Sequence, residues 1–166
     1  MRTYQGAGVD IDAAARFEAM ITERIAAVWP GKEKEIGKFA GGGAIPRGAR
    51  RVEMSTDGVG TKILLLALMD ELYVAGQDAA AMGVVDVYAA GSMPLYMTDT
   101  FKAAKLQPDF HISAIEGVID WCQKAGCILV GGETAELPGM FAHEWIVDLG
   151  CHGRWFSEYR AVLCAR

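Results

Sequence analysis

Apolar residues recur every three or four positions between Phe17 and Val28. This spacing places them on one face of a helix and predicts a segment that packs against a core. Asp10 or Asp12 can cap the start of the helix. Pro30 can end it, because the proline ring does not fit a helix interior.

Further helices follow from the same pattern. The mostly apolar segment 76–91 predicts a largely buried helix over about 78–90. Another helix, with isoleucines at helical spacing, is expected to start near Asp109 and to be closed by Gly126. A short helix is expected near 63–72.

Extended segments separate these helices. The residues at 51–56, 94–100 and 127–130 predict strands, and the last of these is a run of four apolar residues, which is typical of a buried strand. Strands and helices therefore alternate, which predicts an α/β fold of the two-layer α+β type, with a sheet covered by helices on one face. The glycine-rich segment 37–48 is expected to be a flexible loop.

The loop after the first strand, 55–62, reads Ser-Thr-Asp-Gly-Val-Gly-Thr-Lys. Asp57 can bind a hard cation, the backbone near Gly58 and Gly60 can approach a phosphate, and Lys62 can neutralise charge. The loop is not a Walker P-loop, because its lysine follows a threonine and an acid lies inside it. Since Asp-Gly is also common turn chemistry, an ordinary polar loop is the alternative.

A second loop that combines glycines with a carboxylate follows the apolar strand 127–130. Gly131 and Gly132 give the backbone freedom to turn against a ligand, and Glu133 can meet a cation. A structural turn would use the same glycines, so both interpretations stay open. Two loops of one type suggest that they serve one site.

Asp78 and Asp86 interrupt the apolar helix between these loops. Asp78 can cap the start of that helix. A lone carboxylate such as Asp86 is costly to bury, which favours its pairing with a metal or a lysine over an exposed position. The two acids lie roughly 80° apart around the helix, near enough to border one cleft but too far apart for a single tight chelate.

The length and composition of the chain exclude some classes of protein. A chain of 166 residues fits one domain that needs no metal or disulfide to hold it, and its 52% hydrophobic share suits a domain that also buries a subunit interface. The net charge of −5 argues against a nucleic-acid partner. The four cysteines form no Cys-x-x-Cys pair, and no apolar run is long enough to span a bilayer, so a cytoplasmic protein with reduced thiols is expected.

The motifs together resemble the N-terminal, ATP-binding half of the aminoimidazole ribonucleotide synthetases, the phosphoribosylformylglycinamidine cyclo-ligases. Thiamine monophosphate kinase, selenophosphate synthetase and the formylglycinamide ribonucleotide amidotransferase are related to that family and share its general scheme of acids and glycines. The resemblance covers roughly residues 4–150. It is carried by the segments 4–13, 37–46, 55–62, 76–94 and 126–140.

The resemblance implies an ATP- and magnesium-dependent enzyme of purine biosynthesis that closes the imidazole ring of formylglycinamidine ribonucleotide to give aminoimidazole ribonucleotide. It also implies a mixed sheet whose open face packs against a second copy in a homodimer, with no nucleic-acid or membrane partner. The implied catalytic residues are Asp57, Lys62 and Asp86. The implied ATP-binding residues are Gly58, Gly60, Thr61, Lys62, Gly131, Gly132, Glu133 and Thr134, and the implied magnesium ligands are Asp57, Asp78, Asp86 and Glu133.

The chain also departs from the family pattern. Val85 stands where the family has an asparagine before the helical acid, and 91–94 reads Gly-Ser-Met-Pro in place of Gly-Ala-Glu-Pro. The acid of the next strand, Asp99, is retained, but 101–104 has lost the family's Tyr-Ala-Thr-Gly. Two other interpretations therefore stay open: another ATP-using member of the superfamily, of the small-molecule kinase or selenophosphate synthetase type, or a non-catalytic dimeric homologue.

The predicted domain organisation is an ATP-binding domain over 1–150 and a divergent tail over 151–166, with the family's C-terminal domain absent. We expect the tail to be the product of a frameshift or premature stop, or a divergent replacement. An ordinary terminal strand and helix is the alternative.

Overall fold

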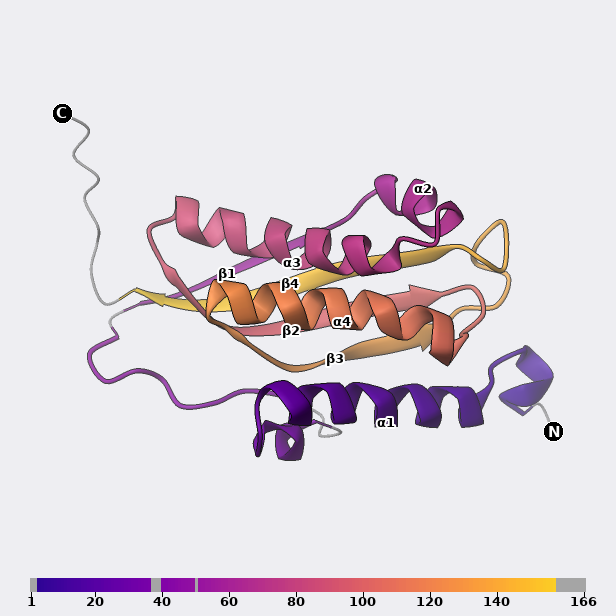
Figure 1. The fold of residues 1–166 in the computed structure, drawn as a ribbon, viewed down its shortest axis with the longest axis horizontal. Coiled ribbons are helices and arrows are strands. Elements are labelled where there is room, and N and C mark those ends of the chain that lie inside the picture. The colour runs from indigo at the N-terminus through magenta and orange to yellow at the C-terminus, as the bar shows by residue number, and fades with distance from the viewer. Residues whose placement is uncertain (1–2, 37–39, 50, 158–166) are drawn as a thin grey trace.

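The protein is described here by a computed structural model that covers residues 3–36, 40–49 and 51–157. A four-stranded sheet forms one layer and helices form the other (Figure 1). The strands are β1 (Arg51–Gly58), β2 (Met93–Ala103), β3 (Ile128–Glu136) and β4 (Val147–Ser157). The α-helices are α1 (Ile11–Val28), α2 (Lys62–Leu68), α3 (Leu72–Ala89) and α4 (Pro108–Ala125), and two 3₁₀ turns are η1 (Gln5–Ala7) and η2 (Lys32–Glu35).

The sheet is mixed, with the strand order β1-β4-β2-β3. β2 and β3 pair in parallel, whereas β4 pairs antiparallel with both β1 and β2. β1, β2 and β3 therefore run in one direction, and their carboxyl ends lie at the same end of the sheet (Figure 1). The predicted mixed sheet with helices on one face is confirmed.

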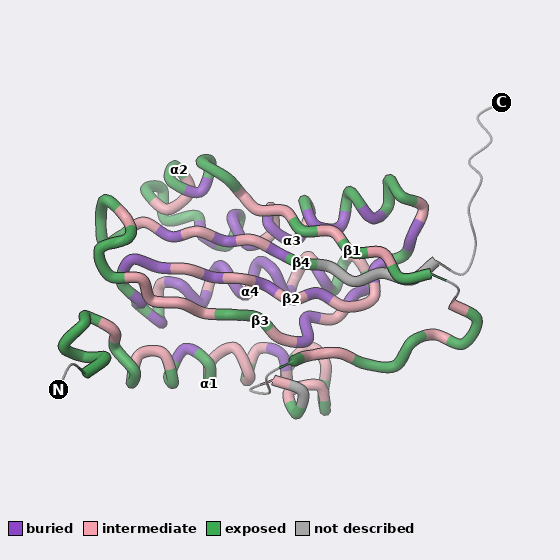
Figure 2. Tube along the Cα trace, turned by 180° about the vertical axis from the view of Figure 1, so that it is seen from behind, coloured by how far each residue is buried: buried purple, intermediate pink, exposed green. Residues whose placement is uncertain are grey.

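The core lies between the sheet and the helix pair α3 and α4. Buried positions follow β2, β4, α3 and α4, while α1 lies beside α4 at the β3 edge (Figure 2). Phe17 of α1 and Phe101 of β2 join the two parts of the core, with ring centroids 5.6 Å apart. No helix of the described ranges is long and apolar enough to cross a membrane.

Local signals place two helix ends as expected. The Asp10 side chain accepts a hydrogen bond from the backbone N–H of Ala13 at 3.0 Å and so caps α1. Gly126, with φ 76°, closes α4 in the left-handed conformation that favours glycine.

The central helix starts earlier than the sequence predicts. α3 begins at Leu72, so Asp78 lies in its second turn, and the interpretation of Asp78 as its cap is wrong. Leu72 and Ala75 are buried in the core, and this burial explains why the helix continues upstream of the acid.

Two glycines let α3 and α4 touch backbone to backbone. A Cβ atom on Gly76 would lie 1.8 Å from the carbonyl oxygen of Ala114, and one on Gly117 would lie 2.0 Å from that of Tyr73. No side chain fits in either position, so the packing of this helix pair depends on both glycines.

β4 extends across residue 150, where the sequence predicts the boundary between the ATP-binding domain and the tail. Its residues 151–157 lie between β1 and β2 in the middle of the sheet. The rest of the predicted tail, 158–166, is outside the described residues.

Candidate functional site

The acidic loop leaves the carboxyl end of β1 beside α3. Side chains alternate along this strand: Thr56 faces the open side of the sheet with His152, whereas Ser55 faces α3, where its hydroxyl donates to Asp86 Oδ2 at 3.2 Å. Asp57 shares the α3 side with Ser55. The sequence favours pairing of Asp86 with a metal or a lysine over an exposed position. Asp86 is exposed and its carboxylate accepts from Ser55, while its pairing with a metal stays a prediction.

Lys62 is the first residue of α2 and lies beside α3. Its Nζ is 2.5 Å from Oδ2 of Asp78, in an ion pair whose side chains are 54% and 30% exposed. Ion pairs this exposed contribute little stability, typically about 0–1 kcal/mol. The lysine can therefore exchange this partner for another anion at small cost.

The turn between β1 and α2 keeps its backbone open. Asp57 Oδ1 accepts a hydrogen bond from the N–H of Gly58 at 2.7 Å, which fixes the start of the turn. Gly60 has φ 68°, and an added Cβ there would meet nothing within 4 Å. A ligand can thus reach the backbone at Gly60, while Thr61 connects this turn to α2.

A row of paired residues crosses the sheet at the level of Asp57. Asp57 pairs with Cys151, Cys151 pairs with Asp99, and Asp99 pairs with Gly132. Asp99 is buried under the helices, and a Cβ on Gly132 would lie 2.0 Å from Asp99 Oδ1. Gly132 is therefore required by the neighbouring carboxyl group.

Asp99 was not among the predicted site residues. Burial raises the pKa of its carboxyl group to about 7, and the negative charge of Glu133 contributes in the same direction. The signal in the sequence was an acid inside an otherwise largely apolar strand, a residue type that is rarely buried without a role.

The second predicted loop is the carboxyl half of β3. Thr134 pairs with Phe101 on the helix side, but Glu133 pairs with Thr100, which lies on the open side of the sheet. Glu136 is structural: its carboxylate accepts from the backbone N–H of Asp10 at 2.5 Å and of Leu106 at 2.8 Å, so it ties the start of α1 to the sheet.

The four predicted magnesium ligands do not form one chelate. Within the described ranges there is no group of three or more His, Cys, Asp or Glu residues that could hold a metal ion. Asp78 and Asp86 are roughly 12 Å apart along α3. Glu133 lies three strands away from Asp57, roughly 14 Å at normal strand spacing.

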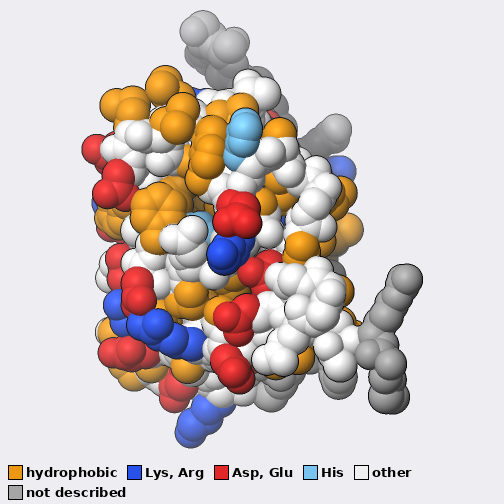
Figure 3. Space-filling view, turned by 90° about the vertical axis from the view of Figure 1, so that its right-hand side faces the viewer, with side chains coloured by type: hydrophobic (Ala, Val, Ile, Leu, Met, Phe, Trp, Pro, Cys, Tyr) orange, Lys and Arg blue, Asp and Glu red, His pale blue; other side chains and the backbone are white. Residues whose placement is uncertain are grey.

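Asp57 and Asp78 lie near the carboxyl end of β1, whereas Asp86 lies in the last turn of α3, beside Ser55 within β1. Acidic and basic side chains gather across the middle of the molecule's surface at the carboxyl end of β1, with hydrophobic side chains above them (Figure 3). Magnesium usually takes one or two protein carboxylates and completes its shell with phosphate oxygens and water. The donor set therefore fits a metal carried by a polyphosphate better than a metal held by protein alone.

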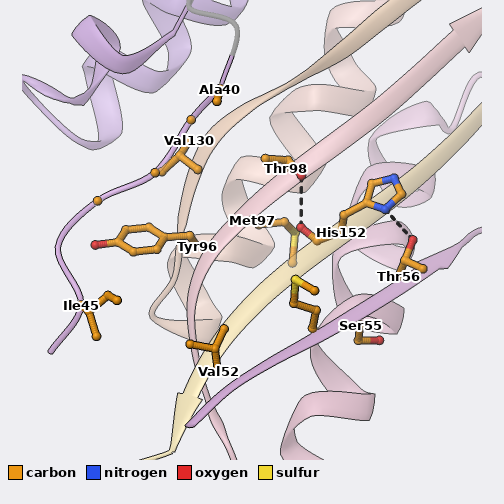
Figure 4. A pocket seen from close by; sticks show the side chains of 14 residues that line it. Ala40, Ile45, Val52, Ser55, Thr56, Tyr96, Met97, Thr98, Val130 and His152 are labelled. Atoms are coloured by element: carbon orange, nitrogen blue, oxygen red, sulfur yellow. Dashed lines mark hydrogen bonds between the residues drawn. The ribbon is translucent and has the colours of Figure 1, made fainter. Parts of the chain in front are cut away.

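A separate cavity of about 660 Å³ lies on the open face of the sheet, under the glycine-rich segment (Figure 4). Tyr96 donates its hydroxyl to the carbonyl oxygen of Ala44 at 2.8 Å, which holds the segment over the sheet. A Cβ on Gly41 would lie 1.9 Å from the carbonyl oxygen of Val130. The described part of this segment is thus packed against the sheet, whereas 37–39 lie outside the described residues.

Polar and apolar side chains share that cavity. The ring of His152 contacts the hydroxyl of Thr56 at 2.5 Å (Figure 4) and that of Thr100 at 2.9 Å. Val52 and Met54 are apolar residues of the cavity lining. None of the residues predicted for the site lines this cavity.

Comparison with known proteins identifies the family. The model of the N-terminal domain of AIR synthase related proteins matches residues 41–155. The chain belongs to this family.

Curated relatives in this family are named phosphoribosylformylglycinamidine cyclo-ligase. The protein of Picosynechococcus sp. is 38% identical over 141 residues, covering 83% of this chain and 41% of the relative. That of Citrifermentans bemidjiense is 42% identical over 143 residues, covering 84% and 41%. The chain thus spans about two fifths of the length of these relatives.

Solved structures of other proteins share the fold. Hydrogenase maturation protein HypE in complex with ATP superposes with a TM-score of 0.56 at 18% identity, covering 83% of this chain and 39% of that one. AaThiL complexed with AMPPCP and TMP gives a TM-score of 0.54 at 18% identity, covering 69% and 35%. At this identity the likeness concerns the fold alone.

Proposed function

We propose that this chain is the ATP-binding half of a cyclo-ligase that converts formylglycinamidine ribonucleotide into aminoimidazole ribonucleotide. The observation that carries the proposal is the identity of about 40% to enzymes of that name over more than four fifths of this chain. Asp57 and the open backbone at Gly60, both at the carboxyl end of β1, support it, because a nucleotide triphosphate needs carboxylates for its magnesium and open backbone for its phosphates.

Each predicted residue has a distinct part in this proposal. ATP supplies the phosphoryl group that activates the substrate oxygen. Asp57 and Asp86 would hold one magnesium ion on the phosphates. Lys62 would turn from Asp78 to the phosphates, and Asp78, roughly 12 Å from Asp86 along α3, would then be free for a second ion. The backbone near Gly60 approaches the phosphates directly. The neighbouring ATP contacts are Gly58, Thr61, Gly131, Gly132 and Thr134, and Glu133 contributes charge from the β3 edge.

Magnesium-dependent ATP binding tests the metal assignment. Asp57→Asn is expected to weaken the affinity for magnesium-ATP by about tenfold to a hundredfold, because loss of one interaction with an ion costs about 1.5–3 kcal/mol. Isothermal titration with ATP, in magnesium and in excess chelator, measures this change. Asp70→Asn is the matched control, since Asp70 is exposed and has φ 60°, a conformation that asparagine tolerates. Equal affinities of the two variants would remove Asp57 from the site.

Turnover distinguishes the three interpretations of the sequence. ADP release with formylglycinamidine ribonucleotide, measured for this chain alone and with a separately expressed C-terminal half, is expected only for the cyclo-ligase. ADP release with thiamine monophosphate, or AMP release with selenide, would instead indicate another superfamily activity. ATP binding without turnover in any mixture would indicate a non-catalytic homologue.

The open face of the sheet is the surface that we propose for the homodimer. Met54 is 72% exposed and Val52 is 49% exposed on β1, and Ile45 is 60% exposed on the glycine-rich segment. A contiguous apolar face of this kind is an interaction surface or an aggregation hazard. A second copy would cover it without burying a charged side chain of β1.

Light scattering after size exclusion tests this dimer. Met54→Asp is expected to convert the dimer to a monomer at micromolar concentration, because the carboxylate would be buried without a partner. Met140→Asp is the control, since Met140 is 74% exposed on the loop after β3. A Met54→Asp chain that elutes as a dimer would place the interface elsewhere.

A further inference from the structure

The end of α4 brings two cysteines together. The backbone N–H of Cys127 donates to the carbonyl oxygen of Cys122 at 2.9 Å, and that of Gly126 donates to Gln123 at 3.2 Å. These two bonds, with Gly126 at φ 76°, form a Schellman motif. The motif places the side chains of its first and last residues in contact, and here both residues are cysteines.

The pair is enclosed by the core. Cys122 is 0% exposed and Cys127 is 1% exposed, and the Cys122 thiol lies 3.5 Å from the thioether sulfur of Met97 on β2. A hydrogen bond from Cys122 lowers the pKa of the Cys127 thiol, whereas the pKa of Cys122 is raised by the same contact. Cys127 is therefore the thiol of the pair that ionises first and reacts as the nucleophile.

The backbone geometry suits a covalent bond between them. Disulfides require Cα atoms about 4.4–6.8 Å apart. Cys127 closes the helical turn that begins at Cys122, and one turn rises about 5.4 Å, which lies within this range. Cys151 is the remaining thiol of this region, but it lies on β4 beside Asp99, and no backbone bond links it to either partner.

We propose that Cys122 and Cys127 are an oxidation site that forms a disulfide with hydrogen peroxide. The Cys127 thiolate attacks one peroxide oxygen, breaks the O–O bond and becomes a sulfenic acid, with release of hydroxide. The Cys122 sulfur then attacks the Cys127 sulfur and displaces the hydroxyl group, which leaves as water with the Cys122 proton. In total, two thiols lose two electrons and two protons, and one peroxide becomes two waters.

Because both thiols are buried, their oxidation by peroxide requires a local opening of the fold. Peroxide reaches the thiols when the last turn of α4 opens, and Gln123, Lys124 and Gly126 are exposed at that turn. The disulfide then holds the end of α4 to the start of β3, the strand that continues into Gly131 and Gly132.

Peptide mapping of the full chain tests the site. Trypsin cleaves after Lys124 and Glu-C cleaves after Glu116 and Glu133, so Cys122 and Cys127 fall in the separate peptides 117–124 and 125–133. After treatment with equimolar peroxide, the unreduced digest of the folded protein is expected to contain these two peptides linked, and dithiothreitol is expected to separate them.

Variants give the matched comparison. Cys122→Ala is expected to abolish the linked species and to leave Cys127 as a sulfenic acid that dimedone traps, whereas Cys151→Ala is expected to keep the link. The wild-type map alone decides the matter if a variant does not fold. A link from either peptide to 145–154, a sulfinic acid without a disulfide, or two thiols that stay reduced in the folded chain would each overturn the proposal.

Discussion

Gly76→Ala is expected to lower the free energy of unfolding by about 3 kcal/mol or more, the upper range for overpacked cores. The new methyl group would lie 1.8 Å from the carbonyl oxygen of Ala114 and 2.8 Å from the backbone nitrogen of Val118. Neither atom is at the end of a flexible side chain, so α3 and α4 must separate along their length. Urea unfolding followed by circular dichroism measures the loss.

Gly83→Ala is the control for this prediction. Gly83 lies on the same helix, but a Cβ there would be 3.7 Å from its nearest neighbours, an ordinary contact. Since alanine is favoured over glycine in a helix interior by about 1 kcal/mol, this variant is expected to be as stable as the native chain or more so. Equal stability of the Gly76 and Gly83 variants would show that the two helices do not pack through their backbones.

A fall in pH from 7 to 4 is expected to remove about 3 kcal/mol of stability through His111 alone, since each unit of pKa shift is worth about 1.4 kcal/mol. The ring is buried between Phe101 and Phe110, and its Nδ1 accepts the backbone N–H of Gln107 at 3.1 Å. Burial lowers the pKa of His111 from 6.5 to about 4. The unfolded chain therefore binds more protons across this interval, so the contribution is complete above pH 6.5 and is lost as pH falls toward 4.

The test compares the native chain with His111→Gln, whose side-chain carbonyl can still accept the Gln107 hydrogen bond. The difference in unfolding free energy between the two is expected to shrink steadily between pH 6.5 and 4. Asp99 acts in the opposite sense: its raised pKa of about 7 contributes stability at low pH that is lost as pH rises from about 4 to 7. Because both proteins contain Asp99, its contribution cancels when one unfolding free energy is subtracted from the other. A difference that does not depend on pH would mean that His111 titrates normally.

The parts of the fold that were predictable are those with local causes. Asp10 caps α1 and Gly126 closes α4 because each acts on backbone groups within a few residues. The earlier start of α3 at Leu72 was missed because burial against other elements decides it. The central position of β4 was missed for the same reason: its neighbours, β1 and β2, are distant in sequence.

The same distinction between local and long-range causes applies to the candidate site. Residue types at Asp57 and Lys62 indicated phosphate and metal chemistry, but no pattern in the sequence showed that Lys62 pairs with Asp78 or that Ser55 contacts Asp86. The side of the sheet to which Glu133 belongs depends on the strand register, which includes an irregularity in the pairing of β2 and β3. A shift of one residue exchanges the two faces, so spacing alone could not place this side chain.

The order of the strands bears on how the protein folds during its synthesis. β1 joins the sheet only through β4, although 88 residues of chain separate the end of one from the start of the other, as counted from Gly58 and Val147. While the ribosome is still extending the chain toward β4, the newly made β1 has no neighbour to pair with, and contacts of such long sequence separation form slowly. A nascent β1 with unpaired edges is a segment prone to aggregation, so chaperone binding at this stage would favour the native sheet.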